Sequence, residues 1–258
     1  MTLHATVDGP PDAPVLLLGS SLGTTGAMWQ PQVAALADRF RVVRYDHLGH
    51  GRSPVPPGPY TIDLLGREVL GLLDHLGVGS AHYAGLSLGG MVGMWLAAHA
   101  PERIDRLALL CTSACLGPAE VWRARAAGVR AGQLGTIADT VVSRWFTPGF
   151  AAARPDTVAG YRDMLTATPP AGYAACCEAI AAMDLRADLA AVRAPTLVIG
   201  AADDPATPPE HAADIAERIL AARLAVVDDA AHLANVEQPA AVARLLRAHF
   251  EPEGGTNQ

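Results

Sequence analysis

Lysine is absent from this sequence of 258 residues, and all 19 basic residues are arginine. Alanine, glycine and proline are abundant, so we attribute the missing lysine to nucleotide bias in a GC-rich genome rather than to function. The 26 acidic residues outnumber the arginines, giving a formal net charge of −7, and no cluster of basic residues stands out. Nucleic-acid binding depends on concentrated positive charge, so this balance argues against a nucleic-acid partner.

The sequence also lacks long apolar runs, and none approaches the length that crosses a bilayer. Its first eight residues have neither the basic nor the apolar region of a secretory leader. Cysteine is scarce: Cys111, Cys115, Cys176 and Cys177 match neither a zinc site nor a thioredoxin motif in their spacing. We therefore expect a cytoplasmic protein with reduced thiols, no membrane partner, no metal and no cofactor.

What the sequence does contain is an alternation of apolar, strand-like runs with helical stretches. Strands are predicted at 15–18, 41–45, 81–84, 107–110, 195–199 and 223–227, and helices at 29–37, 61–76, 88–100, 208–220 and 237–250. This alternation is typical of the α/β class, with a mostly parallel central sheet and helices on both faces. The length is sufficient for one large domain of this kind.

The alternation stops between residues 116 and 184. Four helices are predicted there, at 121–129, 137–146, 157–165 and 173–183, with no strand among them. Open α/β sheets bind ligands at the carboxyl ends of their strands, and a helical insertion at that edge can act as a lid. We therefore predict a core of residues 1–115 and 185–258 and a helical lid of residues 116–184.

The most informative motif is the Gly-x-Ser-x-Gly sequence from Gly85 to Gly89. It follows a predicted strand and precedes a predicted helix, which is the setting of a serine held at a sharp strand-to-helix bend. The two glycines allow strand and helix to approach closely, and the N-terminus of the helix favours negative charge near Ser87. We predict that Ser87 is a nucleophile; the alternative is a glycine-flanked serine in an ordinary turn.

A serine hydroxyl is a weak nucleophile and needs a base, and the base needs an orienting group. His232 follows the last predicted strand and is the candidate base. Asp204 follows the preceding strand, where a turn built by Pro205 and Pro208 would aim its carboxylate at the histidine. The neighbouring Asp203 is the alternative acid. The resulting order of serine, aspartate and histidine is the one this type of sheet uses.

An oxyanion formed at an attacked carbonyl needs two N–H donors. The backbone N–H of Leu88, directly after the nucleophile, is one candidate. The loop after the first strand supplies the other, and there we choose Leu22 over Ser21. In the turn after the second strand, His47 and His50 have no acidic or cysteine cluster beside them, so a role in the turn is favoured over a metal site.

Together these residues resemble the α/β-hydrolase superfamily and, within it, the 3-oxoadipate enol-lactonases of aromatic-acid degradation. The superfamily resemblance rests on the Ser87 motif, the turn of residues 45–53, Asp204 and His232. The closer resemblance rests on residues 20–24, 144–148, 167–173, 176–177, 203–209 and 231–239. The sequence departs from the family pattern at Leu48, where arginine is usual.

The resemblance implies an enzyme that opens an anionic five-membered enol-lactone, which carries an acetate arm, to 3-oxoadipate. A negatively charged chain does not attract anions as a whole, so the substrate carboxylate needs a local cation. The candidates are the lid arginines Arg123, Arg125, Arg130, Arg144, Arg154 and Arg162, and for each the alternative is a surface ion pair with an acid of the lid. We expect Arg144 in that role, Trp122 and Trp145 as apolar walls, and Ser21 in contact with the substrate. The alternatives are a broad-specificity carboxylesterase or cofactor-free perhydrolase and, from another class, a non-catalytic ligand-binding relative. Both a monomer and a small homo-oligomer fit the sequence.

Overall fold

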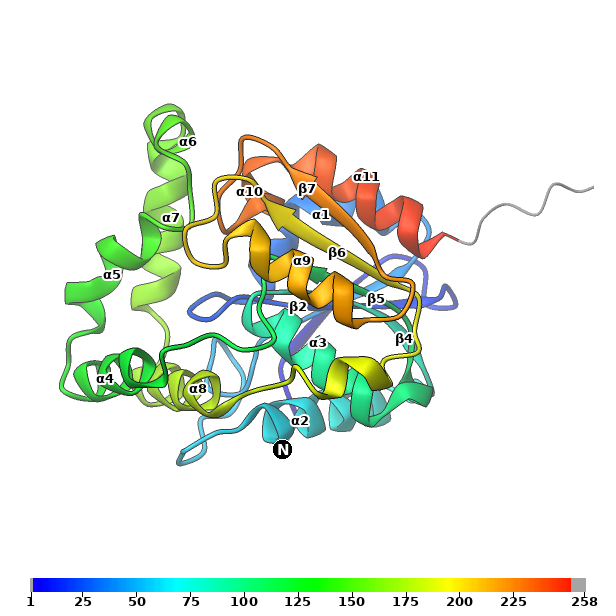
Figure 1. The fold of residues 1–258 in the computed structure, drawn as a ribbon, viewed down its shortest axis with the longest axis horizontal. Helices are drawn as coiled ribbons and strands as arrows, with labels where there is room; N and C mark the ends of the chain where they lie inside the picture. Colours follow the sequence, from blue (N-terminus) through cyan, green and yellow to red (C-terminus); the bar gives the residue numbers. More distant parts are fainter. Residues whose placement is uncertain (1, 252–258) are drawn as a thin grey trace, which may run out of the picture.

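Within residues 2–251, which the computed structural model describes, seven strands form one sheet in the order β1-β3-β2-β4-β5-β6-β7 (Figure 1). The β1 strand runs antiparallel to β3, and the other neighbouring pairs are parallel. The predicted α/β class is therefore confirmed. The strands are β1 Ala5–Asp8, β2 Val15–Gly19, β3 Arg41–Tyr45, β4 Ala81–Leu86, β5 Ile104–Leu110, β6 Thr196–Ala201 and β7 Arg223–Val227.

Helices cover both faces of this sheet. On one face α1 packs against α11, and α2, α3 and α9 lie on the other (Figure 1). These helices are α1 Gln30–Leu36, α2 Ile62–His75, α3 Leu88–His99, α9 Pro209–Arg218 and α11 Pro239–Phe250, and the short α10 spans Ala234–Glu237. No helix in the described part of the chain has both the length and the apolar character that spanning a membrane requires.

Five helices lie between β5 and β6 in the sequence and gather at one end of the sheet, coloured green to yellow-green in Figure 1. They are α4 Ala119–Arg130, α5 Leu134–Val142, α6 Pro148–Ala153, α7 Pro155–Thr166 and α8 Pro170–Ala182. The sequence predicts four helices here and misses α6, because its prolines suggest interruptions. Pro148 instead occupies the first turn of α6, where proline needs no N–H donor, and Thr147 caps that turn.

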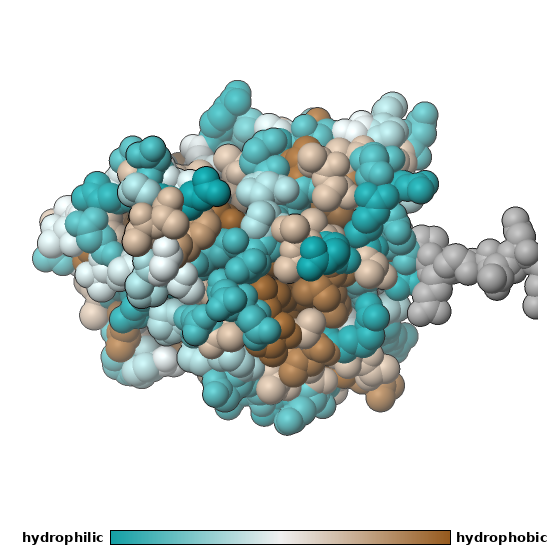
Figure 2. All heavy atoms as spheres, turned by 90° about the horizontal axis from the view of Figure 1, so that it is seen from above, coloured by the Kyte–Doolittle hydropathy of each residue, from teal (hydrophilic) through white to brown (hydrophobic). Residues whose placement is uncertain are grey.

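The two edge strands show why one was predicted and the other missed. β1 is half exposed and short, so it has no apolar pattern that a sequence reading would detect. At the opposite edge, Leu224 and Val226 of β7 are 46% and 47% exposed. Figure 2 looks down on β7 and α11, and apolar side chains gather in one patch on this otherwise largely polar face. The apolar run of β7 thus reflects strand propensity rather than complete burial.

Candidate active site

Ser87 occupies the bend between β4 and α3. Its backbone has φ 56° and ψ −115°, a conformation that residues with a side chain rarely adopt. Neighbouring β5 and the segment after it hold Ser87 there, because the Ser87 N–H donates to the Leu110 carbonyl at 3.0 Å and Thr112 Oγ1 donates to the Ser87 carbonyl at 2.7 Å. A β-carbon at Gly85 would collide with the backbone of Gly89. The predicted sharp bend is present, and the glycines make it sterically possible.

Asp204 and His232 meet where β6 and β7 end. Asp204 Oδ2 lies 2.8 Å from His232 Nδ1, and both side chains are buried. Asp204 Oδ1 accepts the N–H groups of Ala206 at 2.8 Å and Thr207 at 3.0 Å, and Thr207 Oγ1 donates to Oδ2 at 2.7 Å. Burial by itself raises the pKa of Asp204, but His232 and the Thr207 donors outweigh it and lower the pKa below its usual value. The carboxylate is therefore charged and fixed in orientation.

The rival acid, Asp203, lies on the surface next to this pair. Its side chain is exposed, and only its backbone N–H forms a hydrogen bond within the described residues, to the Ala230 carbonyl at 3.0 Å. The structure thus brings Asp204, and not Asp203, to His232. Thr207 is a supporting residue that the sequence analysis missed, although its place three residues after Asp204 is that of a side chain capping its own turn.

One cavity of about 150 Å³ is lined by both Ser87 and His232. The other predicted substrate contacts, Ser21, Leu22, Trp122, Arg144 and Trp145, also line it. The sequence did not single out the remaining lining residues Leu116, Gly117, Val121, Arg125, Val141, Tyr173, Ala206 and Thr207. The Ser87 hydroxyl forms no hydrogen bond with any described side chain; such contacts commonly tighten only when substrate binds.

Two backbone N–H groups beside Ser87, those of Leu22 and Leu88, have no acceptor within residues 2–251. In the loop after β2, the Ser21 N–H donates to Met28 Sδ at 3.2 Å and the Gly23 N–H donates to His50 Nε2 at 3.0 Å, which leaves the N–H of Leu22 free between them. Leu88 is the first residue of α3, where N–H groups have no partner within the helix. This pattern favours Leu22 over Ser21 as an oxyanion donor.

His47 and His50 hold this loop in place. His47 Nε2 donates to the Ser20 carbonyl at 2.9 Å, the same carbonyl that accepts the Gly89 N–H at 3.0 Å. Burial lowers the pKa of His47 to about 3 and that of His50 to about 4. Both imidazoles are therefore neutral at neutral pH, which allows His50 to accept the N–H of Gly23.

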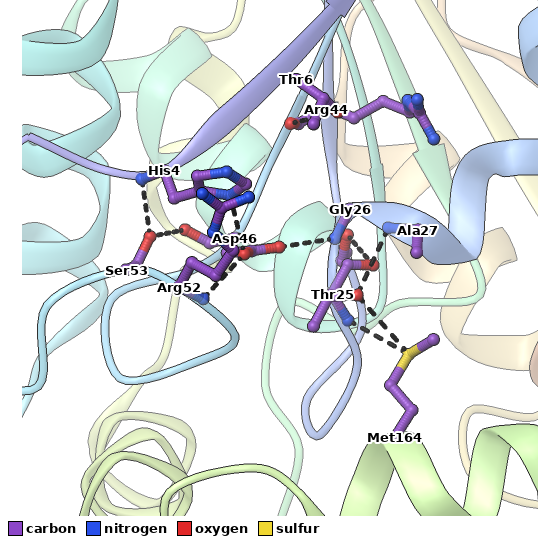
Figure 3. Close-up of polar contacts among 11 residues, drawn as sticks. His4, Thr6, Thr25, Gly26, Ala27, Arg44, Asp46, Arg52, Ser53 and Met164 are labelled. Carbon is purple, nitrogen blue, oxygen red and sulfur yellow. Dashed lines mark hydrogen bonds and ion pairs between the residues drawn. The ribbon is translucent and has the colours of Figure 1, made fainter.

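Asp46 connects the same loop to the amino-terminal segment (Figure 3). Its Oδ1 accepts the Gly26 N–H at 2.9 Å, and its Oδ2 accepts the Arg52 N–H at 3.0 Å and lies 3.0 Å from His4 Nδ1. On the other side of the loop, Thr25 contacts Met164 of α7 through its N–H, 3.4 Å from the sulfur. The turn after β3 and a helix of the 119–182 segment thus support the loop that carries Leu22.

We expect the fold to lose stability on mild acidification because of these two histidines. In the unfolded chain a histidine gains its proton near pH 6.5, whereas His47 and His50 resist protonation until about pH 3 and 4. Above pH 6.5 the two histidines therefore do not reduce the free energy of unfolding. Below that pH, each of them lowers it by about 1.4 kcal/mol for every pH unit. Between pH 7 and pH 5 these two histidines should lower the free energy of unfolding, measured in urea, by about 4 kcal/mol, and His249, whose pKa burial also lowers to about 4, should add to this loss.

Two variants separate this effect from general acid unfolding. His50→Gln should remove about 2 kcal/mol of the pH-dependent loss, because one of the buried histidines that cause it is gone. His75→Gln, at an exposed position on α2, should leave the loss unchanged. Equal pH dependence in both variants would contradict the assignment.

A buried carboxylate, Glu237, joins the loop of His232 to the segment after α5. Glu237 Oε1 accepts the N–H of Thr147 at 2.9 Å and its hydroxyl at 2.8 Å, and Oε2 accepts the Ala231 N–H at 2.6 Å. The Leu233 N–H also donates to the Trp145 carbonyl at 3.0 Å. The residues on both sides of His232 are therefore fixed to the cavity wall that Trp145 forms.

Replacing Glu237 with alanine should destabilise the protein by about 3 kcal/mol, because three donors lose a charged acceptor inside the structure. Chemical denaturation of the wild type and the variant measures this change in the free energy of unfolding. Glu217→Ala, at an exposed site on α9, should change stability by less than about 0.5 kcal/mol. A loss below 1 kcal/mol for Glu237→Ala would mean that the carboxylate does not fasten the loop.

A mostly parallel sheet in this strand order, with a serine at the bend that follows its central strand, is typical of the class of α/β hydrolases. The chain belongs to the alpha/beta hydrolase fold family, whose model matches residues 14–239. It is 42% identical to 3-oxoadipate enol-lactonase 2 of Acinetobacter baylyi, over 96% of this chain and 92% of that protein. The expected resemblance to the enol-lactonases is therefore confirmed.

Two further comparisons bear on specificity. The solved structure of the enol-lactonase from Burkholderia xenovorans LB400 matches with a TM-score of 0.94 at 42% identity, covering 96% of each chain. A protein of Stutzerimonas stutzeri named as the RutD carbamate hydrolase is 32% identical over 98% of this chain and 97% of its own length. Relatives of this chain thus carry the names of different hydrolases.

Proposed function

We propose that this chain is a serine hydrolase that opens the ring of 3-oxoadipate enol-lactone to give 3-oxoadipate, in the breakdown of aromatic compounds. The observation that carries this proposal is one cavity lined by Ser87, His232 and Leu22. Asp204 is paired with His232 next to it, and the free N–H group of Leu88 directly follows Ser87. A volume near 150 Å³ suits a substrate with a single small ring. The 42% identity to an enol-lactonase supports the choice of substrate.

The proposed mechanism follows from these positions. His232 removes the proton of the Ser87 hydroxyl as the oxygen attacks the lactone carbonyl, while the N–H groups of Leu22 and Leu88 stabilise the oxyanion. The ring C–O bond breaks, and the enol oxygen leaves with the proton from His232 and tautomerises to a ketone. Water, activated by His232, then hydrolyses the acyl-serine ester. Asp204 orients the imidazole and stabilises its charged form throughout.

In the same proposal, residues 116–184 form a lid over the strand ends. Trp122 and Trp145 supply apolar walls for the lactone ring, Ser21 contacts it, and Arg144 adds positive charge at the cavity. Helices α4, α5 and α8 of this segment contribute residues to the cavity lining, which supports a role in substrate selection.

The test is a comparison of kcat/KM for three substrates: the enol-lactone, a small alkyl carbamate and a neutral nitrophenyl ester. The proposal predicts a preference for the enol-lactone of at least about 100-fold over both others, because only it matches the cavity in shape and charge. A preference for the carbamate would favour the activity named for the Stutzerimonas relative. Comparable rates with the lactone and the neutral ester would favour a broad esterase.

A further inference from the structure

Two polar side chains at the cavity wall, Arg125 and Tyr173, take no part in the mechanism above. Arg125 lies on α4 and Tyr173 on α8, and both line the cavity. The hydroxyl of Tyr173 is buried, and the Arg125 guanidinium beside it can only donate, so the Tyr173 O–H group has no acceptor within residues 2–251. A buried O–H group without an acceptor destabilises the folded protein. It therefore indicates that a bound ligand supplies the missing partner.

The guanidinium of Arg125 is also without an acidic partner in the described part of the chain. Three other arginines of the 119–182 segment, Arg123, Arg130 and Arg162, each pair with an aspartate or glutamate. Arg125 instead lies over the ring of Trp122, with Cζ 4.6 Å from the ring centroid. This cation–π contact holds an uncompensated, half-buried positive charge at the cavity wall.

The two groups lie close to each other and to the loop that carries Leu22. Burial raises the pKa of Tyr173, and the nearby positive charge of Arg125 partly opposes that rise. The Tyr173 ring packs closely against Gly23: a β-carbon added to Gly23 would lie only 3.1 Å from Tyr173 Cε2. Gly23 directly follows Leu22, the candidate oxyanion donor. Tyr173, with Arg125 beside it, thus lies next to the loop that would bind the oxyanion of the scissile carbonyl.

We propose that Arg125 and Tyr173 form the subsite that binds the carboxylate of the substrate. A guanidinium donates two parallel hydrogen bonds to a carboxylate, and the Tyr173 hydroxyl donates a further one. The inference rests on the proposed hydrolase function and narrows it to esters and lactones whose carboxylate is a few bonds from the scissile carbonyl. Arg144, the cation expected from the sequence, also lines the cavity, but its side chain is exposed and water screens its charge.

The test uses two nitrophenyl esters of similar size: the monosuccinate, which keeps a free carboxylate, and the neutral butyrate. The wild type should prefer the monosuccinate. Arg125→Met should lower kcat/KM for the monosuccinate about 100-fold, mainly through KM, with a much smaller loss for the butyrate. Tyr173→Phe should lower kcat/KM for the monosuccinate about tenfold, again with a much smaller loss for the butyrate. Arg123→Met, on the same helix but outside the cavity, is the matched control and should keep the preference.

Each result bears on one proposal. If Arg125→Met lowers the rates with both esters equally, or if Arg144→Met alone removes the preference, the Arg125–Tyr173 subsite is wrong while the hydrolase function stands. If the wild type hydrolyses neither ester nor the enol-lactone, the hydrolase function is wrong. Calorimetric titration with adipate then tests the subsite without turnover: Arg125→Met should weaken binding about tenfold. Unchanged adipate binding would overturn the subsite.

Discussion

Ser87→Ala should reduce kcat for the enol-lactone by on the order of 10⁵-fold. In the proposed mechanism the substitution removes the atom that forms the acyl intermediate, while the cavity and the N–H groups of Leu22 and Leu88 remain. These give a residual rate above that in water. Single-turnover kinetics with stoichiometric substrate measure the loss, and a fluorophosphonate should label the wild type but not the variant.

The chain contains a matched control for this experiment. Ser113 Oγ lies 2.9 Å from His211 Nδ1, so it also forms a serine–histidine contact. It lies outside the cavity, and its hydroxyl donates to the Cys115 carbonyl at 2.8 Å instead of to the imidazole. Ser113→Ala should therefore retain most of the activity. An equal loss in both variants, or substantial turnover by Ser87→Ala, would refute the nucleophile.

Asp204→Asn should lower kcat by about 10⁴-fold with little change in KM. The carboxylate accepts hydrogen bonds on both oxygens, from Thr207, from the backbone and from His232. An asparagine NH2 group would face a donor on either side, so one contact is lost whichever way the amide turns. The imidazole then loses both its orientation and the negative charge that stabilises its protonated form.

Asp203→Asn is the control for Asp204→Asn, because the two positions are adjacent and receive the same chemical change. Its exposed side chain makes no contact with His232, so its kcat should stay within about twofold of the wild type. The decisive quantity is the ratio of the kcat values of the two variants. A larger loss of kcat for Asp203→Asn than for Asp204→Asn would mean that Asp203 is the acid that orients His232.

The sequence predicts the parts of the site that depend on local chemistry. Gly85 and Gly89 identify the bend because only glycine permits such close backbone contact, and Pro205 with Pro208 mark the turn that aims Asp204. Strands buried on both faces are visible as continuous apolar runs, whereas the short, half-exposed β1 is not. The prolines around α6 were misinterpreted because proline can begin a helix as well as interrupt one.

The sequence predicts Trp122, Arg144 and Trp145 at the cavity, but it does not select Arg125 and Tyr173. Trp122 and Arg125 have the spacing of neighbours on one helix face, and that signal was available. Tyr173 becomes significant only when α8 packs against α4, which places its hydroxyl beside Arg125 without an acceptor in the described residues. The sequence offered several arginines of the 119–182 segment and gave no means to separate the paired ones from the unpaired ones.

The proposed catalytic side chains and much of the cavity wall come from different parts of the chain. Ser87, Asp204 and His232 follow strands of the sheet, whereas Trp122, Arg125 and Tyr173 belong to helices that supply no reacting atom. Substitutions on those helices can therefore change the substrate specificity one residue at a time, while the proposed catalytic residues stay the same. Relatives named as enol-lactonases and carbamate hydrolases on one architecture are the outcome expected of such divergence.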